Sequence, residues 1–120
     1  PARGYGLKKI MQYIEKQYEI EKLPVILMGD FNANPGHKLI KGFLEWELNN
    51  QKFVAVQDYD RSIYTKATMG GFKDREKGMH LDYIFISPEH KVEKVQIIKD
   101  NINGRFPSDH YPLLADIYQA

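Results

Sequence analysis

The chain has 120 residues, of which 42% are hydrophobic and 28% are charged, and its formal net charge is +1. This length corresponds to one domain, and this composition argues against disorder over most of the chain. Because the net charge is near neutral, the chain as a whole has no electrostatic field that would favour binding to nucleic acid or to an anionic membrane. The absence of cysteine excludes disulfides, thiolate metal sites and cysteine nucleophiles.

The ends of the chain and its apolar runs bear on processing and localisation. No apolar run approaches the roughly 20 residues that a membrane-spanning helix needs, and the first segment is too charged and amphipathic for a signal peptide. The sequence therefore leaves the compartment open. The chain begins at Pro1 rather than at methionine, which favours a processed protein or an excised segment. No repeat, low-complexity tract or linker divides it, so we expect one continuous domain over 1–120.

A helix followed by a strand opens the chain. Over residues 4–20 the apolar side chains recur at helical spacing, and they are Leu7, Ile10, Met11, Ile14 and Tyr18. This pattern predicts an amphipathic helix. The wholly apolar run 25–28 stops at Gly29, which predicts a short strand buried on both faces. A helix that leads directly into such a strand indicates an α/β layer architecture.

A second helix and further strands are predicted after this point. Helical spacing returns over about 36–48, with Asn34 as the capping residue and Pro35 in the first turn. Apolar, β-prone runs predict further strands, and these lie at 53–56, 81–87, 92–98 and 113–118. The polar or glycine-bearing segments 65–79 and 101–109 are predicted to be loops.

Polar side chains attach to the ends of three of these strands. Asp30 and Asn32 follow the first strand, Asp82 begins a later one, and Asp109 and His110 precede the last. In open α/β sheets, ligands commonly bind outside the strand ends. We therefore expect these side chains to meet at one rim of the sheet.

These residue types suit hydrolysis of a phosphoester. A carboxylate can orient or deprotonate a water molecule, and carboxylates can hold a hard divalent cation that binds phosphate oxygens. A histidine bonded to a second carboxylate keeps one tautomer and can donate a proton. Taken singly, each cluster also fits a plain turn, a solvated strand-edge residue or a locally hydrogen-bonded loop. The three together, each beside an apolar strand, favour chemistry.

Three sequence blocks carry a resemblance to a known family. Gly29-Asp30-Phe31-Asn32, the run LDYIF at 81–85 and the run PSDHYP at 107–112 resemble the last three signature blocks of the endonuclease/exonuclease/phosphatase superfamily. That superfamily includes deoxyribonuclease I-like nucleases, apurinic endonucleases, sphingomyelinases, inositol polyphosphate phosphatases and poly(A) deadenylases. The resemblance implies an α/β fold, namely half of a deoxyribonuclease I-like four-layer sandwich with a mixed sheet and helices on one face. Residues 1–120 would form the carboxyl-terminal part of that domain.

The resemblance also implies a role for each matching residue. Asp30 would orient or activate the attacking water and approach a metal ion, and Asn32 would hydrogen-bond a phosphate oxygen. Asp82 would hold His110 in its productive tautomer, and His110 would contact the scissile phosphate. Asp109 would be a metal ligand or lie beside one. Mg²⁺ is the expected ion, with Mn²⁺ as a substitute.

Part of the family's site has no counterpart in this sequence. The amino-terminal half of family members normally brings an Asn, a Glu metal ligand and a His, and no segment here matches those blocks. We therefore expect weak divalent-ion binding by the chain alone, with Asp30 and Asp109 repelling each other when no ion is present. A half-sandwich would also expose an apolar sheet face, so we expect a partner that carries the other half, or self-association.

Basic residues in the two predicted loops are candidate substrate contacts. They are Lys73, Arg75 and Arg105. Positive side chains can bind substrate phosphates, but the loop 66–77 also carries compensating acids, as a solvated loop would. The histidines at 37, 80 and 90 have no ligand spacing and are predicted to be surface or satisfied residues, and Trp46 is predicted to serve in packing.

Two functions of different classes follow from these patterns. The first is a Mg²⁺-dependent phosphoester hydrolase, inactive as an isolated fragment without its amino-terminal half. The second is a non-catalytic binding or scaffold module. The presence of every expected site residue in this part favours the hydrolase. The near-neutral charge weakly disfavours a dedicated nuclease, yet DNA, RNA, lipid headgroups, inositol phosphates and sugar phosphates all stay open as substrates.

Overall fold

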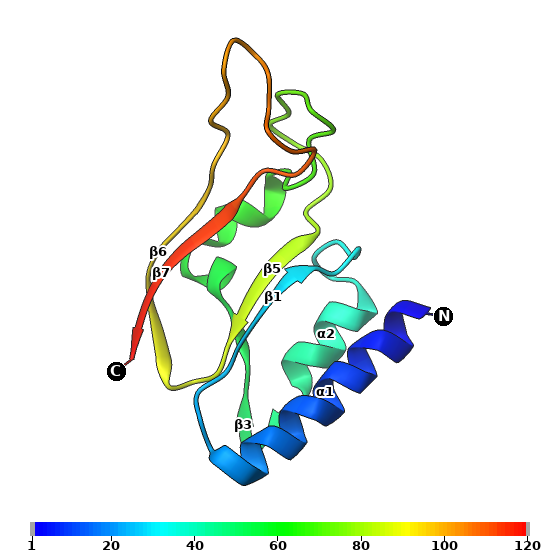
Figure 1. Ribbon diagram of the computed structural model, residues 1–120, viewed down its shortest axis with the longest axis vertical. Coiled ribbons are helices and arrows are strands. Elements are labelled where there is room, and N and C mark those ends of the chain that lie inside the picture. Colours follow the sequence, from blue (N-terminus) through cyan, green and yellow to red (C-terminus); the bar gives the residue numbers. More distant parts are fainter. Residues whose placement is uncertain (1, 120) are drawn as a thin grey trace.

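The computed structural model describes residues 2–119, with two α-helices lying together beside a small sheet (Figure 1). Pro1, on which the expectation of a processed chain rests, lies outside the described residues. The first helix is α1 (Ala2–Glu21), which agrees with the predicted 4–20. The second is α2 (Lys38–Glu45), which is shorter than the predicted 36–48.

The strands pair antiparallel throughout the part of the chain that the structure describes. Their bounds are β1 (Ile26–Asp30), β2 (Glu47–Leu48), β3 (Gln51–Lys52), β4 (Val54–Ala55), β5 (Asp82–Ile86), β6 (His90–Ile97) and β7 (Leu113–Gln119). One sheet has the order β1-β5-β4, and β2-β3 and β6-β7 form separate pairs. The expected α/β class is therefore observed, whereas the sheet expected to be mixed has only antiparallel pairings between residues 2 and 119. The β2-β3 hairpin and the 3₁₀ segment η1 (Val56–Thr65) were not predicted.

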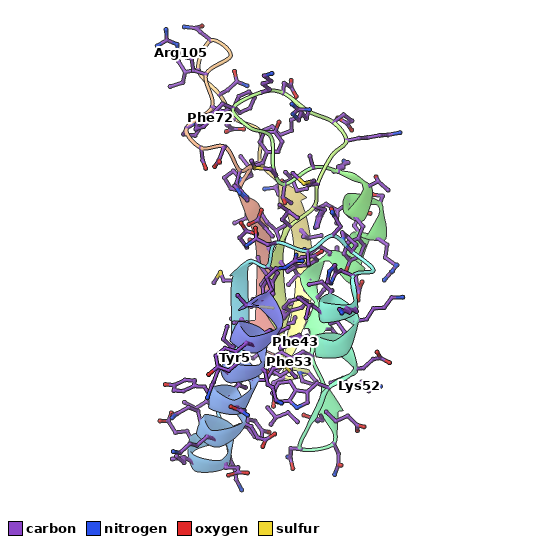
Figure 2. All side chains as sticks on the ribbon, turned by 90° about the vertical axis from the view of Figure 1, so that its right-hand side faces the viewer. Tyr5, Phe43, Lys52, Phe53, Phe72 and Arg105 are labelled. Atoms are coloured by element: carbon purple, nitrogen blue, oxygen red, sulfur yellow. The ribbon has the colours of Figure 1, made fainter. Side chains whose placement is uncertain are left out.

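The first core lies between the two helices and one face of the β1-β5-β4 sheet. Its buried members include Leu7, Ile14, Ile40, Phe43 and Phe85. Figure 2 shows Phe43 and Phe53 side by side, and their ring centroids are 5.3 Å apart. Trp46 stacks on Phe53 with centroids 6.0 Å apart, so its predicted packing role is confirmed. Ile10, which was expected on the buried face of α1, is 40% exposed.

A second core holds the β6-β7 pair against the opposite face of the sheet. Val56, Ile63, Ile86 and Val95 are its buried members. Ile84 and the inward residues of β7 pack around them. The central strand β5 is thus covered on both faces, because its alternate side chains enter the two cores.

Two predictions about local structure were wrong. Strand β1 is not buried on both faces, because Ile26 is 43% exposed and Met28 is 65% exposed. The reason is that only its inward residue Leu27 reaches the first core, while Ile26 and Met28 belong to neither core. Asn34 does not cap α2, since its side-chain oxygen accepts from the His80 N–H at 3.0 Å. The cap is His37, whose Nδ1 accepts from the Leu39 N–H at 3.1 Å.

Candidate active site

The register of β1 against β5 places two carboxylates opposite each other. Asp30 is the last residue of β1, Asp82 is the first residue of β5, and the two are Cα partners in the antiparallel ladder. Like charges directly opposite across a strand pair are destabilising. The pair therefore favours a positive group between the two carboxylates.

The imidazole of His110 lies between the carboxylates of Asp30 and Asp82. Its Nδ1 lies 2.7 Å from Asp82 Oδ2, and its Nε2 lies 3.6 Å from Asp30 Oδ2. Because a carboxylate only accepts hydrogen bonds, Asp82 holds the tautomer with the proton on Nδ1. Nε2 is then the ring nitrogen that faces Asp30, with the His110 side chain 26% exposed. The structure thus brings together three of the residues expected at the rim.

The two carboxylates also set the protonation of His110. The hydrogen bond with Asp82 raises the pKa of His110 above its ordinary value, and the charges of Asp82, Asp30 and Asp109 act in the same direction. Partial burial opposes them. By contrast, burial lowers the pKa of His80, which is 1% exposed.

We expect His110 to stabilise the fold more at acidic than at alkaline pH. A raised folded pKa contributes stability that is fully present below the unfolded pKa of about 6.5 and is lost as the pH rises through the folded value. Urea unfolding of the wild type and His110→Gln should therefore differ most at about pH 6 and converge at higher pH. The opposite contribution of His80 is present in both proteins and cancels. A difference that grows with pH would contradict the assigned sign.

The segment that carries His110 is fixed by the loop 65–79. Met69 forms an isolated antiparallel bridge with His110. The N–H groups of Gly70 and Gly71 both donate to the carbonyl of Asp109, at 2.8 and 2.9 Å. The Asp109 carboxylate lies outside the group formed by Asp30, Asp82 and His110. Its Oδ1 is 3.5 Å from the Ser108 hydroxyl.

Asn32 lies next to Asp30 in a tight turn. Its φ of 51° is in the left-handed region, and its N–H donates to Asp30 Oδ1 at 2.8 Å. Arg3 donates from its guanidinium to the Asn32 carbonyl. The amide side chain is exposed beside the site, so one Asp30 oxygen is occupied by this turn and the other faces His110.

The basic candidates Lys73, Arg75 and Arg105 are not among the residues that line the cleft beside the site. Arg75 donates from Nε to the Gly70 carbonyl at 3.1 Å, so its guanidinium is partly engaged within its own loop. Lys73 and Arg105 are exposed, and Figure 2 shows Arg105 at the far tip of the molecule.

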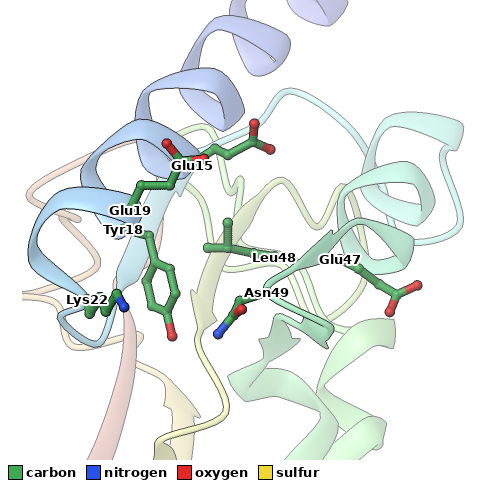
Figure 3. Close-up of a pocket in the computed structure, with 7 residues that line it drawn as sticks. All are labelled: Glu15, Tyr18, Glu19, Lys22, Glu47, Leu48 and Asn49. Atoms are coloured by element: carbon green, nitrogen blue, oxygen red, sulfur yellow. The ribbon is translucent and has the colours of Figure 1, made fainter.

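The cleft beside the site has a volume of about 290 Å³. Its lining includes Met28, Asp82, His110 and Leu113. A larger pocket of about 440 Å³ lies between α1 and the β2-β3 hairpin (Figure 3), where Glu15, Tyr18, Glu19, Lys22, Glu47, Leu48 and Asn49 line it. No part of the Asp30–Asp82–His110 group reaches this second pocket.

The donor atoms of the site fit a divalent cation in part. Asp30, Asp82 and His110 each offer one atom, and these atoms lie within 4.8 Å of one another. A hard cation such as Mg²⁺ prefers oxygen ligands, which the carboxylates provide. The imidazole fits Mg²⁺ less well, because its free Nε2 is a nitrogen donor and imidazole suits transition metals such as zinc better than magnesium. Two carboxylates are fewer than the oxygen ligands that a tight site needs.

Sequence reasoning missed the buried polar residues behind the site. Thr68 and Gln57 are both 0% exposed, and both hydrogen-bond the backbone of Asp82. Thr68 stands in a polar, glycine-bearing loop and Gln57 stands within the 3₁₀ segment η1, which carries several charged residues. Neither position has an apolar periodicity that would have indicated burial. The prediction that His80 is satisfied is confirmed, since its two ring nitrogens bond Gln57 and the Lys66 carbonyl.

Comparison with known proteins gives one family match. Residues 9–110 match the model of the Endonuclease/Exonuclease/phosphatase family. A search of curated proteins found no match. In the described part of the chain, neither helix has the length and apolar character needed to cross a membrane.

Several solved structures have a similar fold. A mannosyl-6-phosphatase from Bacteroides thetaiotaomicron gives a TM-score of 0.75 at 19% identity, covering 98% of this chain and 46% of its own. A conserved protein of unknown function from Enterococcus faecalis gives 0.74 at 26% identity, covering 99% and 45%. The catalytic domain of human Nocturnin gives 0.69 at 23% identity, covering 98% and 41%. These likenesses confirm the predicted fold class, and the chain spans less than half the length of each structure.

Proposed function

Because the chain belongs to the endonuclease/exonuclease/phosphatase family, we propose that it is the carboxyl-terminal part of a Mg²⁺-dependent phosphoester hydrolase. The observation that carries the proposal is His110 held between two carboxylates, 2.7 Å from Asp82 and 3.6 Å from Asp30. The buried His80 has an amide and a backbone carbonyl as the partners of its two ring nitrogens, whereas His110 has both nitrogens directed at carboxylates and stands at the rim of an open cleft. Residues 1–120 would then be one part of a larger domain.

The Asp82–His110 pair would act on the phosphoryl group. Asp82 fixes the Nδ1 proton, so His110 presents Nε2 to the substrate. The raised pKa of His110 favours the protonated ring, which can donate to a phosphoryl oxygen and stabilise the charge that develops there. Asp82 therefore has a positioning role and His110 contacts the reacting group.

Asp30 and Asn32 would act on the other side of the phosphate. The Asp30 oxygen that faces His110 can orient the attacking water or take its proton. The exposed Asn32 amide, fixed beside Asp30 by the turn, can donate to a phosphate oxygen. We propose Asp30 and Asp109 as the residues that would hold Mg²⁺, or Mn²⁺ in its place, although the Asp109 carboxylate lies outside the group that Asp30, Asp82 and His110 form. When bound there, the ion would supply neutralisation of charge on the phosphoryl oxygens.

We expect the chain by itself to bind Mg²⁺ weakly, because the described carboxylates are too few for a closed shell of oxygen ligands. Calorimetric titration of Mg²⁺ should give a dissociation constant in the millimolar range or above, on the order of the weakest protein sites. Asp30→Asn should weaken it further, while Asp116→Asn on β7 should leave it unchanged. Tight binding by the isolated chain would contradict the assignment of an incomplete site.

The proposal is tested by hydrolysis of bis-p-nitrophenyl phosphate with and without Mg²⁺. The full-length protein should turn over this diester, and the His110→Ala variant should not. The isolated 120 residues should be inactive or nearly so. Activity in the isolated chain that His110→Ala abolishes would show that the site is complete as it stands. Equal activity in the wild type and the variant would reject the proposed role of His110.

The partner of this chain is proposed from its outer sheet face. Ile26 and Met28 are exposed on β1, which is an edge strand whose free side can pair with another strand. We propose that the rest of the domain covers this face, and that the isolated chain self-associates through it. The phosphoester itself stays open between nucleic acid, lipid headgroup, inositol phosphate and sugar phosphate, with Lys73, Arg75 and Arg105 as proposed outer contacts.

Ile26→Lys should reduce this self-association. A charged side chain on the edge strand opposes strand pairing and removes apolar area from the contact. Light scattering across a concentration series should show a lower mean mass for this variant than for the wild type. Ile102→Lys is the matched control, because Ile102 is 78% exposed in a loop that lies outside the sheet. A monomeric wild type at high concentration would contradict the proposal.

A further inference from the structure

Thr68 lies behind the Asp82–His110 pair and is fully buried, at 0% exposure. Its hydroxyl oxygen accepts two backbone hydrogen bonds, from the Leu81 N–H at 2.8 Å and from the Asp82 N–H at 3.2 Å. These are the N–H groups at the point where β5 begins. One side chain from a loop thus fixes the backbone from which the Asp82 carboxylate projects.

The backbone of Thr68 is bonded to the other half of the pair. Its carbonyl accepts from the Tyr111 N–H at 2.7 Å, and Tyr111 follows His110 directly. Its own N–H donates to the Met79 carbonyl at 3.0 Å. Thr68 therefore touches the Asp82 segment through its hydroxyl and the His110 segment through its carbonyl, although these segments are 28 residues apart.

A second buried side chain holds the Asp82 segment from the carbonyl side. Gln57 is 0% exposed, and its Nε2 donates to the Asp82 carbonyl at 3.0 Å and to His80 Nε2 at 3.1 Å. His80 Nδ1 donates in turn to the Lys66 carbonyl at 3.0 Å. Breaking either hydrogen bond of Gln57 Nε2 would leave a buried acceptor on Asp82 or His80 unpaired, which is costly, so these bonds favour the observed geometry.

We propose that Thr68 is a positioning residue that sets the separation of Asp82 and His110, with Gln57 as its support. The Asp82–His110 hydrogen bond at 2.7 Å joins two segments that share no ladder of strand pairing around these residues. Its length is therefore set by the groups that hold both segments, and Thr68 is bonded to both. Displacement of a reacting group by about 1 Å can reduce a rate by about a hundredfold.

The expected effect of Thr68 on the rate rests on the proposed function. Its expected effect on the separation of Asp82 and His110 does not. The test uses the full-length protein with its histidines labelled with ¹⁵N. Thr68→Val removes the hydroxyl and keeps the shape, and Thr68→Ser keeps the hydroxyl. Thr65→Val is the matched control, since Thr65 is exposed and its hydroxyl bonds the Ser62 carbonyl.

Thr68→Val should abolish the downfield resonance of the His110 Nδ1 proton, and it should lower kcat by about a hundredfold while leaving KM within about twofold. Thr68→Ser should keep the proton resonance and kcat at the level of the wild type, and Thr65→Val should also leave the resonance and kcat unchanged. If the Val variant does not fold, Gln57→Leu gives the second arm. It breaks the bond to the Asp82 carbonyl and also removes Gln57 Oε1, a buried atom without a hydrogen-bond partner in the described part of the chain.

Each outcome decides one of the two proposals. A Val variant that is less stable but keeps the proton resonance and kcat would overturn the positioning role, as would a Ser variant that restores neither. In the Gln57→Leu arm, an unchanged resonance would likewise overturn it. If the resonance behaves as expected while His110→Ala hydrolyses phosphoesters normally, the positioning role stands and the proposed function fails.

Discussion

Replacing His110 by Ala in the full-length protein should lower kcat/KM for phosphoester hydrolysis by about a thousandfold or more. His110 is the residue through which both carboxylates act, since Asp82 fixes its tautomer and Asp30 faces its second nitrogen. Removal of the ring eliminates the donor to the phosphoryl oxygen and leaves Asp30 and Asp82 opposite each other without a group between them. Steady-state kinetics with bis-p-nitrophenyl phosphate measures the loss.

The Asp82→Asn variant tests how Asp82 positions His110, separately from the contact that His110 makes with the phosphoryl group. An amide can offer its N–H₂ to Nδ1 and so favour the wrong tautomer, which should cost about a hundredfold or more. In the double variant the two losses should not add, because the residues act as a unit. His37→Asn is the control, since it removes an imidazole but keeps a capping side chain on α2. A loss below about tenfold for His110→Ala would reject its assigned role.

Gly70→Ala should destabilise the fold by about 3 kcal/mol, which is at the upper end of the usual cost of overpacking. A Cβ at Gly70 would lie 2.7 Å from Tyr111 Cε1, and closer still to Cζ and the hydroxyl oxygen. The Tyr111 ring cannot retreat, because it is 2% exposed and its hydroxyl is bonded to Lys73 and Arg75 of the same loop. The change should therefore also displace His110, the neighbour of Tyr111.

Urea unfolding compares this variant with Gly42→Ala. Gly42 lies within α2, where an added Cβ would meet no atom within 4 Å beyond the backbone of the helix itself. Alanine there should therefore stabilise the helix by up to about 1 kcal/mol. The two changes are chemically identical and should have opposite signs. A Gly70→Ala variant as stable as the wild type would show that the loop can move away from Tyr111.

Much of the fold was predictable because local patterns decide it. Helix α1 and strands β5 and β7 follow from periodicity and apolar runs, and their observed bounds lie within a few residues of those predicted. The register of β1 on β5 was not predictable, although it places Asp30 opposite Asp82. Sequence distance gives no register between strands that are far apart along the chain, since register is fixed by which side chains share a core.

The candidate site was likewise predictable from the sequence only in part. The sequence by itself determined the residue types, because Asp30, Asp82 and His110 stand beside apolar strands in blocks that resemble one family. Only the tertiary structure decided which ring nitrogen faces which carboxylate, and which residues hold them there. Thr68 and Gln57 have no local pattern that marks them, because their role comes from burial and from hydrogen bonds to distant backbone groups. Such contacts exist only after the chain has folded.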